Sequence, residues 1–139
     1  MTERKFEALG GKVSAPGRRL EVFPAPAHVK KVVLESDEVT SLCPVTGQPD
    51  WETIRIEFEP DAWCVESKSL KLYFWSFREE GAFCEELAAR VAKDIDEACK
   101  PHRVTVTVTQ KPRGGIAIQA VASLTSEPTS LRTGFGRSA

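Results

Sequence analysis

The spacing of apolar side chains changes twice between residues 53 and 120, and this change limits the possible folds more than any other feature of the sequence. Residues 53–59 (TIRIEFE) and 104–109 (VTVTVT) alternate polar and apolar side chains, which is typical of strands with one buried face. Between them, apolar residues recur every three or four positions, which predicts two amphipathic helices. The sequence therefore predicts an α+β fold, with an antiparallel sheet and both helices packed on one face.

Turn signals divide this region into hairpins and helices. Pro60–Asp61 predicts a turn after the first strand, and residues 63–66 are expected to return beside it. Gly81 separates the two helices, and Pro101 ends the second. Residues 111–115 (KPRGG) predict another turn before a last strand. The expected order is strand, strand, helix, helix, strand, strand, and the open edges of such a sheet favour pairing with other subunits.

Length and charge narrow the class of protein further. A chain of 139 residues fits one domain, which we expect over residues 31–122, after an irregular arm (1–30) and before a mobile tail (123–139). Nineteen basic and twenty acidic residues give a net charge of −1, which argues against direct nucleic-acid binding. No apolar run approaches the ~20 residues that span a bilayer, and the polar N-terminal segment does not resemble a signal peptide. We therefore expect a cytoplasmic protein with no membrane partner.

The four cysteines show no spacing typical of a metal site or of a disulfide framework. The two histidines lie far from any cysteine pair, so we predict no metal. Free and mostly buried thiols are the ordinary expectation for all four cysteines in a reducing compartment.

One cysteine lies in a segment that favours chemistry. Residues 41–50 (SLCPVTGQPD) contain two prolines and a glycine, which restrict a loop that presents Cys43 and Asp50 together. A thiolate is a strong nucleophile toward unsaturated carbon, and a nearby carboxylic acid can protonate the nitrogen of an attacked nitrile. From these residues alone, a buried cysteine with Asp50 capping a turn remains the simpler alternative.

Three further segments have residues suited to a nucleotide-like ligand. In residues 65–73 (VESKSLKLY), Ser67 or a neighbour can cap a helix whose N–H groups suit a phosphate. Residues 83–86 (FCEE) supply carboxylates for a guanine-like base, and residues 112–115 (PRGG) let backbone approach a phosphate. The outer face of the first helix is basic with one aromatic side chain: Lys68, Lys71, Trp75 and Arg78. Each of these features has a simpler alternative. The basic face can be an ordinary solvated helix face, the carboxylates of residues 83–86 can be favourable charge in a first helical turn, and residues 112–115 can form a plain hairpin.

The combination, order and spacing of these segments resemble the QueF family, the NADPH-dependent 7-cyano-7-deazaguanine reductases. The matching stretches are SLCPVTGQPD (41–50), VESKSLKLY (65–73), SFREEG leading into FCEE (76–86) and KPRGGI (111–116). The resemblance covers most of residues 41–120. It implies a tunnelling fold (T-fold), whose subunits form homo-oligomeric rings with active sites between neighbours.

The resemblance also implies a role for each matched residue. Cys43 matches the nucleophile that forms a thioimide with the nitrile of the deazaguanine, and Asp50 matches the proton donor, which would have to hold a proton near neutral pH. The base pocket corresponds to Val65, Glu66, Ser67, Cys84 and Glu85, and the NADPH site to Lys68, Lys71, Arg113 and Gly114. Cys84 departs from the family pattern, because members have a histidine at this position, immediately before the anchoring glutamate.

Two successive reductions would then give 7-aminomethyl-7-deazaguanine, a queuosine precursor used in tRNA modification. Three alternatives remain open from the sequence. An archaeal type of relative forms an amidine from the same nitrile but would not use the lysine-bearing cofactor motif. GTP cyclohydrolase shares the T-fold but needs zinc, for which this chain has too few histidines. A non-catalytic purine-binding oligomer would have no use for Cys43, Asp50 and Glu85 together.

Overall fold

The computed structural model describes residues 15–126, so residues 1–14 of the expected arm and residues 127–139 of the expected tail lie outside the described residues, while residues 123–125 of that tail belong to the last strand. The elements, in chain order, are β1 (Val22–Pro24), β2 (Val32–Leu42), β3 (Pro49–Glu59), β4 (Trp63–Val65), α1 (Ser67–Trp75), α2 (Cys84–Cys99), β5 (Arg103–Arg113) and β6 (Ile116–Thr125). Part of the expected N-terminal arm is therefore regular, because β1 lies within it.

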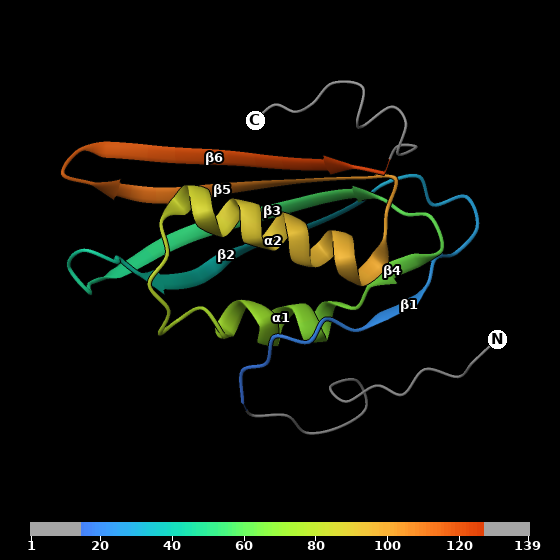
Figure 1. Cartoon of the computed structure of the whole chain (residues 1–139), viewed down its shortest axis with the longest axis horizontal. Helices are drawn as coiled ribbons and strands as arrows, with labels where there is room; N and C mark the ends of the chain where they lie inside the picture. Colours follow the sequence, from blue (N-terminus) through green and yellow to red (C-terminus); the bar gives the residue numbers. More distant parts are fainter. Residues whose placement is uncertain (1–14, 127–139) are drawn as a thin grey trace.

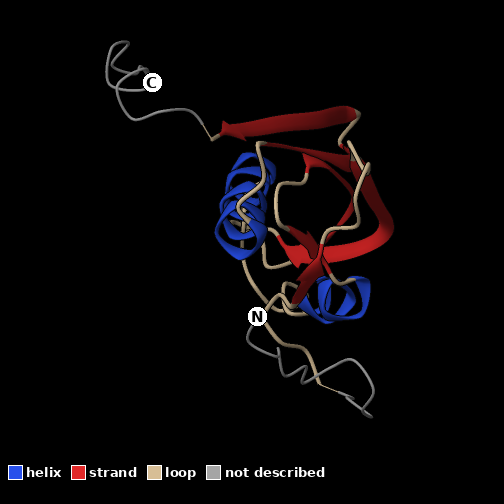
Figure 2. Ribbon diagram, turned by 90° about the vertical axis from the view of Figure 1, so that its right-hand side faces the viewer, coloured by secondary structure: helices blue, strands red, loops and turns tan. Residues whose placement is uncertain are grey.

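The main sheet has the order β2-β3-β5-β6, with every neighbouring pair antiparallel. The sheet curves around the two helices, which cover the same face (Figures 1 and 2). This arrangement confirms the predicted α+β class with helices on one face. β2 and β6 form the two sides of the sheet, and neither has a second strand partner among residues 15–126. Such free edges are suited to pairing between subunits.

The expected pairing of the first hairpin is wrong. Residues 63–66 do not return along the strand at 53–59, because β3 is already paired on both sides, with β2 and with β5. The short β4 instead pairs with β1, where Val22 lies opposite Val65. Strand β2 gives little alternation signal, since its register shifts between Ser36 and Val39 and it lies at the edge of the sheet.

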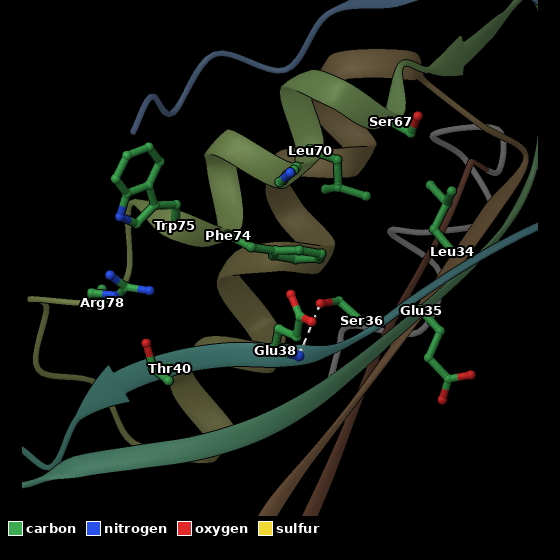
Figure 3. Close-up of a pocket in the computed structure, with 11 residues that line it drawn as sticks. Leu34, Glu35, Ser36, Glu38, Thr40, Ser67, Leu70, Phe74, Trp75 and Arg78 are labelled. Atoms are coloured by element: carbon green, nitrogen blue, oxygen red, sulfur yellow. Dashed lines mark hydrogen bonds between the residues drawn. The ribbon is translucent and has the colours of Figure 1, made fainter. Parts of the chain in front are cut away.

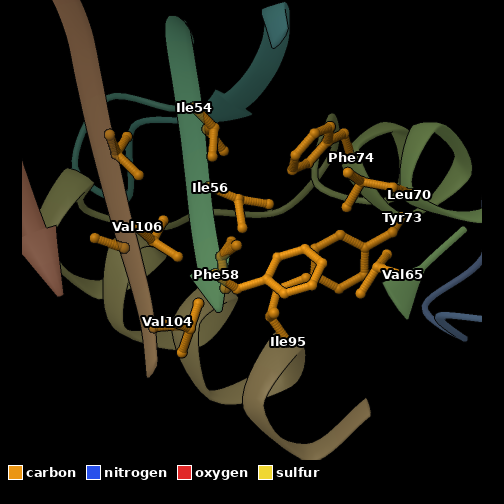
Figure 4. Packing of buried hydrophobic residues seen from close by; sticks show 14 of the residues in the cluster. Ile54, Ile56, Phe58, Val65, Leu70, Tyr73, Phe74, Ile95, Val104 and Val106 are labelled. Atoms are coloured by element: carbon orange, nitrogen blue, oxygen red, sulfur yellow. The ribbon is translucent and has the colours of Figure 1, made fainter. Parts of the chain in front are cut away.

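The core forms where the inward side chains of the two central strands meet the helices. Ile54, Ile56 and Phe58 of β3 point toward α1 and α2, beside the inward valines of β5 (Figure 4). The period-two alternation puts the apolar side chains of each strand on one face. Tyr73 is fully buried, and its hydroxyl donates to the carboxylate of Asp94 at 2.6 Å, which ties α1 to α2.

The helix ends follow recognisable local signals. The side chain of Glu66 accepts hydrogen bonds from the first backbone N–H groups of α1, so a neighbour of Ser67 is the cap. α2 ends at Lys100, whose backbone is left-handed (φ 48°), immediately before Pro101 as predicted. Neither helix of residues 15–126 has the length and hydropathy that a membrane crossing requires.

Candidate active site

Three segments that are distant in the sequence meet at one end of the subunit. They are the β2–β3 turn, the start of α2 and the β5–β6 turn, all at the left in Figure 1. The β2–β3 turn is held against the segment before α2 by two backbone hydrogen bonds, from Leu42 N–H to the Glu80 carbonyl (2.9 Å) and from Ala82 N–H to the Leu42 carbonyl (3.1 Å). Cys43, Asp50, Glu85 and Arg113 therefore lie on segments of the same end.

The cysteine loop is a tight turn between two strands. The backbone N–H of Cys43 donates to the Gln48 carbonyl at 2.8 Å, and the N–H of Gly47 donates to the Cys43 carbonyl at 2.8 Å. Gly47 has a φ of 74°, which a residue with a Cβ adopts at a cost. The loop motif thus fixes the direction in which the thiol is presented.

Hydrogen bonds to the sulfur lower the pKa of Cys43 from its ordinary 9.0 to about 7. The largest contribution is the hydroxyl of Thr46, followed by the backbone N–H groups of Thr46 and Val45, while Arg113 adds a smaller one and partial burial opposes them. A substantial fraction of Cys43 is therefore thiolate near neutral pH, which is the reactive form.

The other three cysteines have the opposite character. Burial raises the pKa of Cys64, of Cys84 to about 11 and of Cys99 to about 12. All three are buried, whereas Cys43 is partly exposed. Of the four cysteines, only Cys43 is both accessible to solvent and substantially ionised to the thiolate near neutral pH. Within residues 15–126, no group of three or more His, Cys, Asp or Glu side chains is placed to hold a metal ion.

We expect Thr46→Val to move the pKa of Cys43 upward, toward 9.0, because the valine lacks the hydroxyl that contributes most to the lowering. The rate of alkylation by iodoacetamide, measured against pH, gives this pKa directly. Thr53→Val on β3 is the matched control and should leave the alkylation profile unchanged. A profile for Thr46→Val that coincides with the wild type would contradict this account of the thiolate.

Arg113 has different partners from those that the sequence suggests. Its guanidinium donates to the carboxylate of Asp50, forms a longer contact with the side-chain carbonyl of Gln48 (3.5 Å) and bonds to the sulfur of Cys43. One cation thus joins the nucleophile and the acid of the predicted pair. Arg113 is therefore engaged by Asp50 and Cys43 within the subunit, and its predicted phosphate contact stays a prediction.

Gly114 is explained by the hairpin itself. Gly114 and Gly115 have φ values of 60° and 79°, and Arg113 lies opposite Ile116 across the two-residue loop. Positive φ at both central positions is the requirement of the type of turn that joins tightly paired strands. A Cβ at Gly114 would meet nothing within 4 Å, so close approach is not the reason for this glycine.

Glu52 is a buried carboxyl group that the sequence analysis overlooked. Its side chain is 2% exposed, and Oε2 accepts a hydrogen bond from the hydroxyl of Ser41 at 2.7 Å. Burial raises its pKa from 4.5 to about 7, the Ser41 hydrogen bond opposes this, and the charge of Asp50 adds to it. A signal was available, because extending the alternation of residues 53–59 backward puts positions 50 and 52 on the inward face.

The start of α2 presents one of its two candidate residues. Glu85 is exposed in the first turn, while Cys84 is buried and its thiol donates to the carbonyl of Val108 at 3.5 Å. The helix has no side-chain cap, and Phe83 before it is exposed. Of this pair, Glu85 is therefore the residue that an incoming molecule meets.

The second group of candidate residues lies at the opposite end of the subunit. α1 begins next to β4, at the right in Figure 1, so Val65, Glu66 and Ser67 are far from the Cys43 turn within one chain. Val65 and Glu66 are buried, and Ser67 is exposed. Both carboxylate oxygens of Glu66 accept backbone hydrogen bonds, from Lys68 and Ser69 at 2.7 Å. Glu66 therefore occupies these two N–H groups within the subunit, and a phosphate contact at this helix start stays a prediction.

A cavity of about 360 Å³ lies between α1 and the edge strand β2 (Figure 3). Ser67, Lys71 and Trp75 line it from α1, Arg78 lines it from the segment after α1, and Glu35 and Glu38 line it from β2, with the carboxylate of Glu38 directed toward α1 (Figure 3). Three of the four residues predicted on the basic helix face thus share one cavity. Lys68, Arg113 and Gly114 are not among its lining residues.

Comparison with known proteins assigns the family. A sequence profile of the QueF-like protein family matches residues 49–129. The chain is 44% identical over 119 residues to the NADPH-dependent 7-cyano-7-deazaguanine reductase of Frankia casuarinae, covering 86% of this chain and 95% of that protein. The chain belongs to the QueF-like family. Reductases of the same name from Nitrosococcus oceani (45% over 105 residues, 74% and 81% covered) and an Anaeromyxobacter species (47% over 103 residues, 73% and 84%) are also similar to this QueF-like chain.

The fold of this QueF-like chain also occurs in a solved structure. The crystal structure of the archaeosine synthase QueF-Like in the apo form has a TM-score of 0.66 and 25% sequence identity, and the match covers 71% of this chain and 97% of that one. The family predicted from the four sequence motifs is confirmed. The profile begins at Pro49, so it includes Asp50, Glu85 and Arg113 but starts after Cys43.

Proposed function

We propose that this protein reduces the nitrile of 7-cyano-7-deazaguanine to the primary amine, with NADPH as the reductant. The observation that carries the proposal is the pairing of a low-pKa thiol, Cys43, with the Asp50 carboxylate through Arg113. The names of the similar curated proteins support the same substrate and cofactor. The product would be 7-aminomethyl-7-deazaguanine, a queuosine precursor. The reduced thiol that Cys43 needs is consistent with a cytoplasmic reaction.

The first step is a covalent addition at Cys43. The thiolate sulfur forms a bond to the nitrile carbon, the displaced π electron pair moves to nitrogen, and that nitrogen takes a proton by way of Asp50. The product of this step is a thioimide, and no atom changes its redox state overall. The covalent bond holds the carbon in place for the reductions that follow.

Glu85 is an exposed carboxylate suited to the base. Glu85 lies in the first turn of α2, at the same end of the subunit as the cysteine loop, and a carboxylate there can accept two hydrogen bonds from the N–H and amino edge of a deazaguanine. This contact would retain the base between the two reductions. Cys84 lies beneath Glu85 in the core and is proposed to shape the floor of the pocket rather than to move protons.

The cavity on α1 fits part of a dinucleotide. Lys71 and Arg78 are cations for its phosphates, and the ring of Trp75 offers a stacking surface. NADPH supplies hydride to carbon when it is bound, and the cavity residues would orient it. At about 360 Å³ the cavity holds only a portion of such a molecule, so we propose that the remainder lies against a neighbouring subunit.

A complete site requires two chains. The β2–β3 turn and the start of α1 lie at opposite ends of one subunit (Figure 1), and the cavity that contains Lys71 extends along α1 between them. The free edges of β2 and β6 permit continuation of the sheet into neighbouring subunits. We propose a homo-oligomer in which the start of α1 of one subunit, including Val65, Glu66 and Ser67, faces the cysteine loop of the next.

The direct test measures cofactor absorbance. Incubation with 7-cyano-7-deazaguanine should oxidise NADPH in a nitrile-dependent manner, with two NADPH consumed per amine formed, as judged by product mass. The structural likeness to an archaeosine synthase favours one alternative, amidine formation from the same nitrile. Amidine product with ammonia, and no oxidation of NADPH, would replace the proposed reaction with this one.

Lys71→Ala should raise the KM for NADPH by about tenfold, because one phosphate contact is lost, while thioimide formation without cofactor is unchanged. Steady-state kinetics and intact mass measure the two effects separately. Lys93→Ala, which removes an exposed lysine from α2, is the matched control and should alter neither. An unchanged KM for Lys71→Ala would remove the cavity on α1 from the cofactor site.

A further inference from the structure

Glu52 has an oxygen atom whose burial requires an explanation. Its Oε1 is fully buried and has no hydrogen-bond partner among the described residues, whereas Oε2 is bonded to Ser41. Leaving a polar atom unpaired inside a protein costs about 1–3 kcal/mol by general experience, and more when the group is charged. Side chains of this kind are rarely kept for packing alone.

Groups from every surrounding element face this carboxyl. On its own strand, Asp50 lies two residues away on the same face, about 7 Å along the strand. β2 contributes the hydroxyl of Ser41, and β5 contributes the buried amide side chain of Gln110, whose backbone pairs with that of Glu52. α2 contributes the neutral thiol of Cys84, on which the charges of Glu52 and Asp50 both act.

The charges around these two carboxyl groups favour a proton on Glu52. Arg113, from β5, donates to Asp50 and is the cation in direct contact with it. A single guanidinium balances one negative charge, and a second carboxylate on the same buried face would be unbalanced. The charge of Asp50 adds to the burial that raises the pKa of Glu52, so a proton is retained on Glu52, on the same face as Asp50.

Building on the proposed function, we propose that Glu52 is the proton reserve of the active site, which refills Asp50 when that residue protonates the nitrile nitrogen. Glu52 acts through Asp50 and does not touch the substrate. In this step, the Cys43 thiolate, the nitrile and one proton combine to give the thioimide. The proton leaves Asp50 for nitrogen, Glu52 supplies Asp50, and solvent refills Glu52 after release.

The protonation of Glu52 agrees with this role. Burial raises its pKa to about 7, so the group is protonated below neutral pH and loses its proton as pH rises through that range. Cys43 titrates in the same range in the opposite sense, because its thiolate is the active form. Thioimide formation should therefore be fastest near pH 7 and decline on both sides.

The test compares Glu52→Gln with wild type in thioimide formation, followed by intact mass with 7-cyano-7-deazaguanine and no NADPH. We expect the variant to be slower by about tenfold at the wild-type optimum and to lose the decline on the alkaline side, since glutamine does not titrate. Glu59→Gln, at the exposed end of the same strand, should retain the wild-type profile. A Glu52→Gln variant with the wild-type rate and alkaline decline would overturn the inference.

Two further readouts separate this role from a structural one. Base affinity should be unchanged in Glu52→Gln, and a loss of affinity equal to the loss of rate would identify Glu52 as a structural residue instead. Infrared spectra of the wild type should contain a protonated carboxyl band that titrates near neutral pH and is absent from Glu52→Gln. If the wild type lacks this band, Glu52 is not the proton reserve. If the wild type shows the band but never forms the thioimide adduct, the proposed function is refuted instead.

Discussion

Cys43→Ala is expected to abolish both the mass increase on incubation with 7-cyano-7-deazaguanine and the nitrile-dependent oxidation of NADPH. Cys43 is the one thiol of the four that is both accessible and low in pKa, so no other sulfur can take over the addition. Removal of a covalent nucleophile typically lowers kcat by about 10³-fold or more. The base should still bind to the variant, because Glu85 and its surroundings are unchanged.

Cys64→Ala is the matched control for this experiment. Cys64 is buried on β4, and burial raises its pKa, so it should contribute nothing to the adduct. We expect the control to retain the mass increase and the turnover. An adduct that survives in Cys43→Ala would move the nucleophile to another residue and remove the basis for the proposed reaction.

Two variants that are each impaired alone should recover activity when they are combined in one oligomer. Cys43→Ala removes the nucleophile from the β2–β3 turn, and Lys71→Glu reverses a cation in the cavity on α1. If each site takes its cysteine loop and its α1 cavity from different chains, co-expression generates some sites with both halves intact. Random assembly of equal amounts would place intact halves together in about a quarter of the sites.

The measurement is the specific activity of the purified mixture against each variant alone. A single chain that carries both substitutions, co-expressed with Cys43→Ala, is the control, because every site in that mixture lacks the nucleophile. No recovery in the test mixture would mean that each chain completes its own site. The two groups of residues would then have to approach each other by a rearrangement within the subunit.

The sequence predicts the central strands and the helices but not the edge strand β2 or the pairing of β4, for physical reasons. β3, α2 and β5 as far as Gln110 are buried on one face, so their apolar residues keep a strict period. β2 lies at an edge and contains a register shift, which breaks the alternation. β4 cannot pair with β3 because β2 and β5 already pair with both edges of that strand. The local sequence pattern does not show which strands pair with β3.

The candidate site divides in the same way. Cys43 and Asp50 are predicted together because a short proline- and glycine-containing loop joins them, and the structure places them in and beside one turn. The contact of Arg113 with Asp50 joins residues that are 63 positions apart, so only the register of the strands reveals it. Glu52 is one of many acidic residues, so its residue type alone does not predict a role in the site. Its inward position does follow from the period of the strand.

The burial of Glu52 has a consequence for the heat tolerance of this protein. Since folding raises the pKa of this carboxyl from 4.5 to about 7, the stability that its proton confers is complete below pH 4.5 and is lost as pH rises through about 7. The loss amounts to roughly 3 kcal/mol, a large share of the 5–15 kcal/mol typical of a domain. A neutral residue of similar shape at position 52 should therefore raise the melting temperature of the protein above neutral pH. Variants selected in the laboratory for thermal stability alone would tend to replace Glu52, and their reaction would be slower.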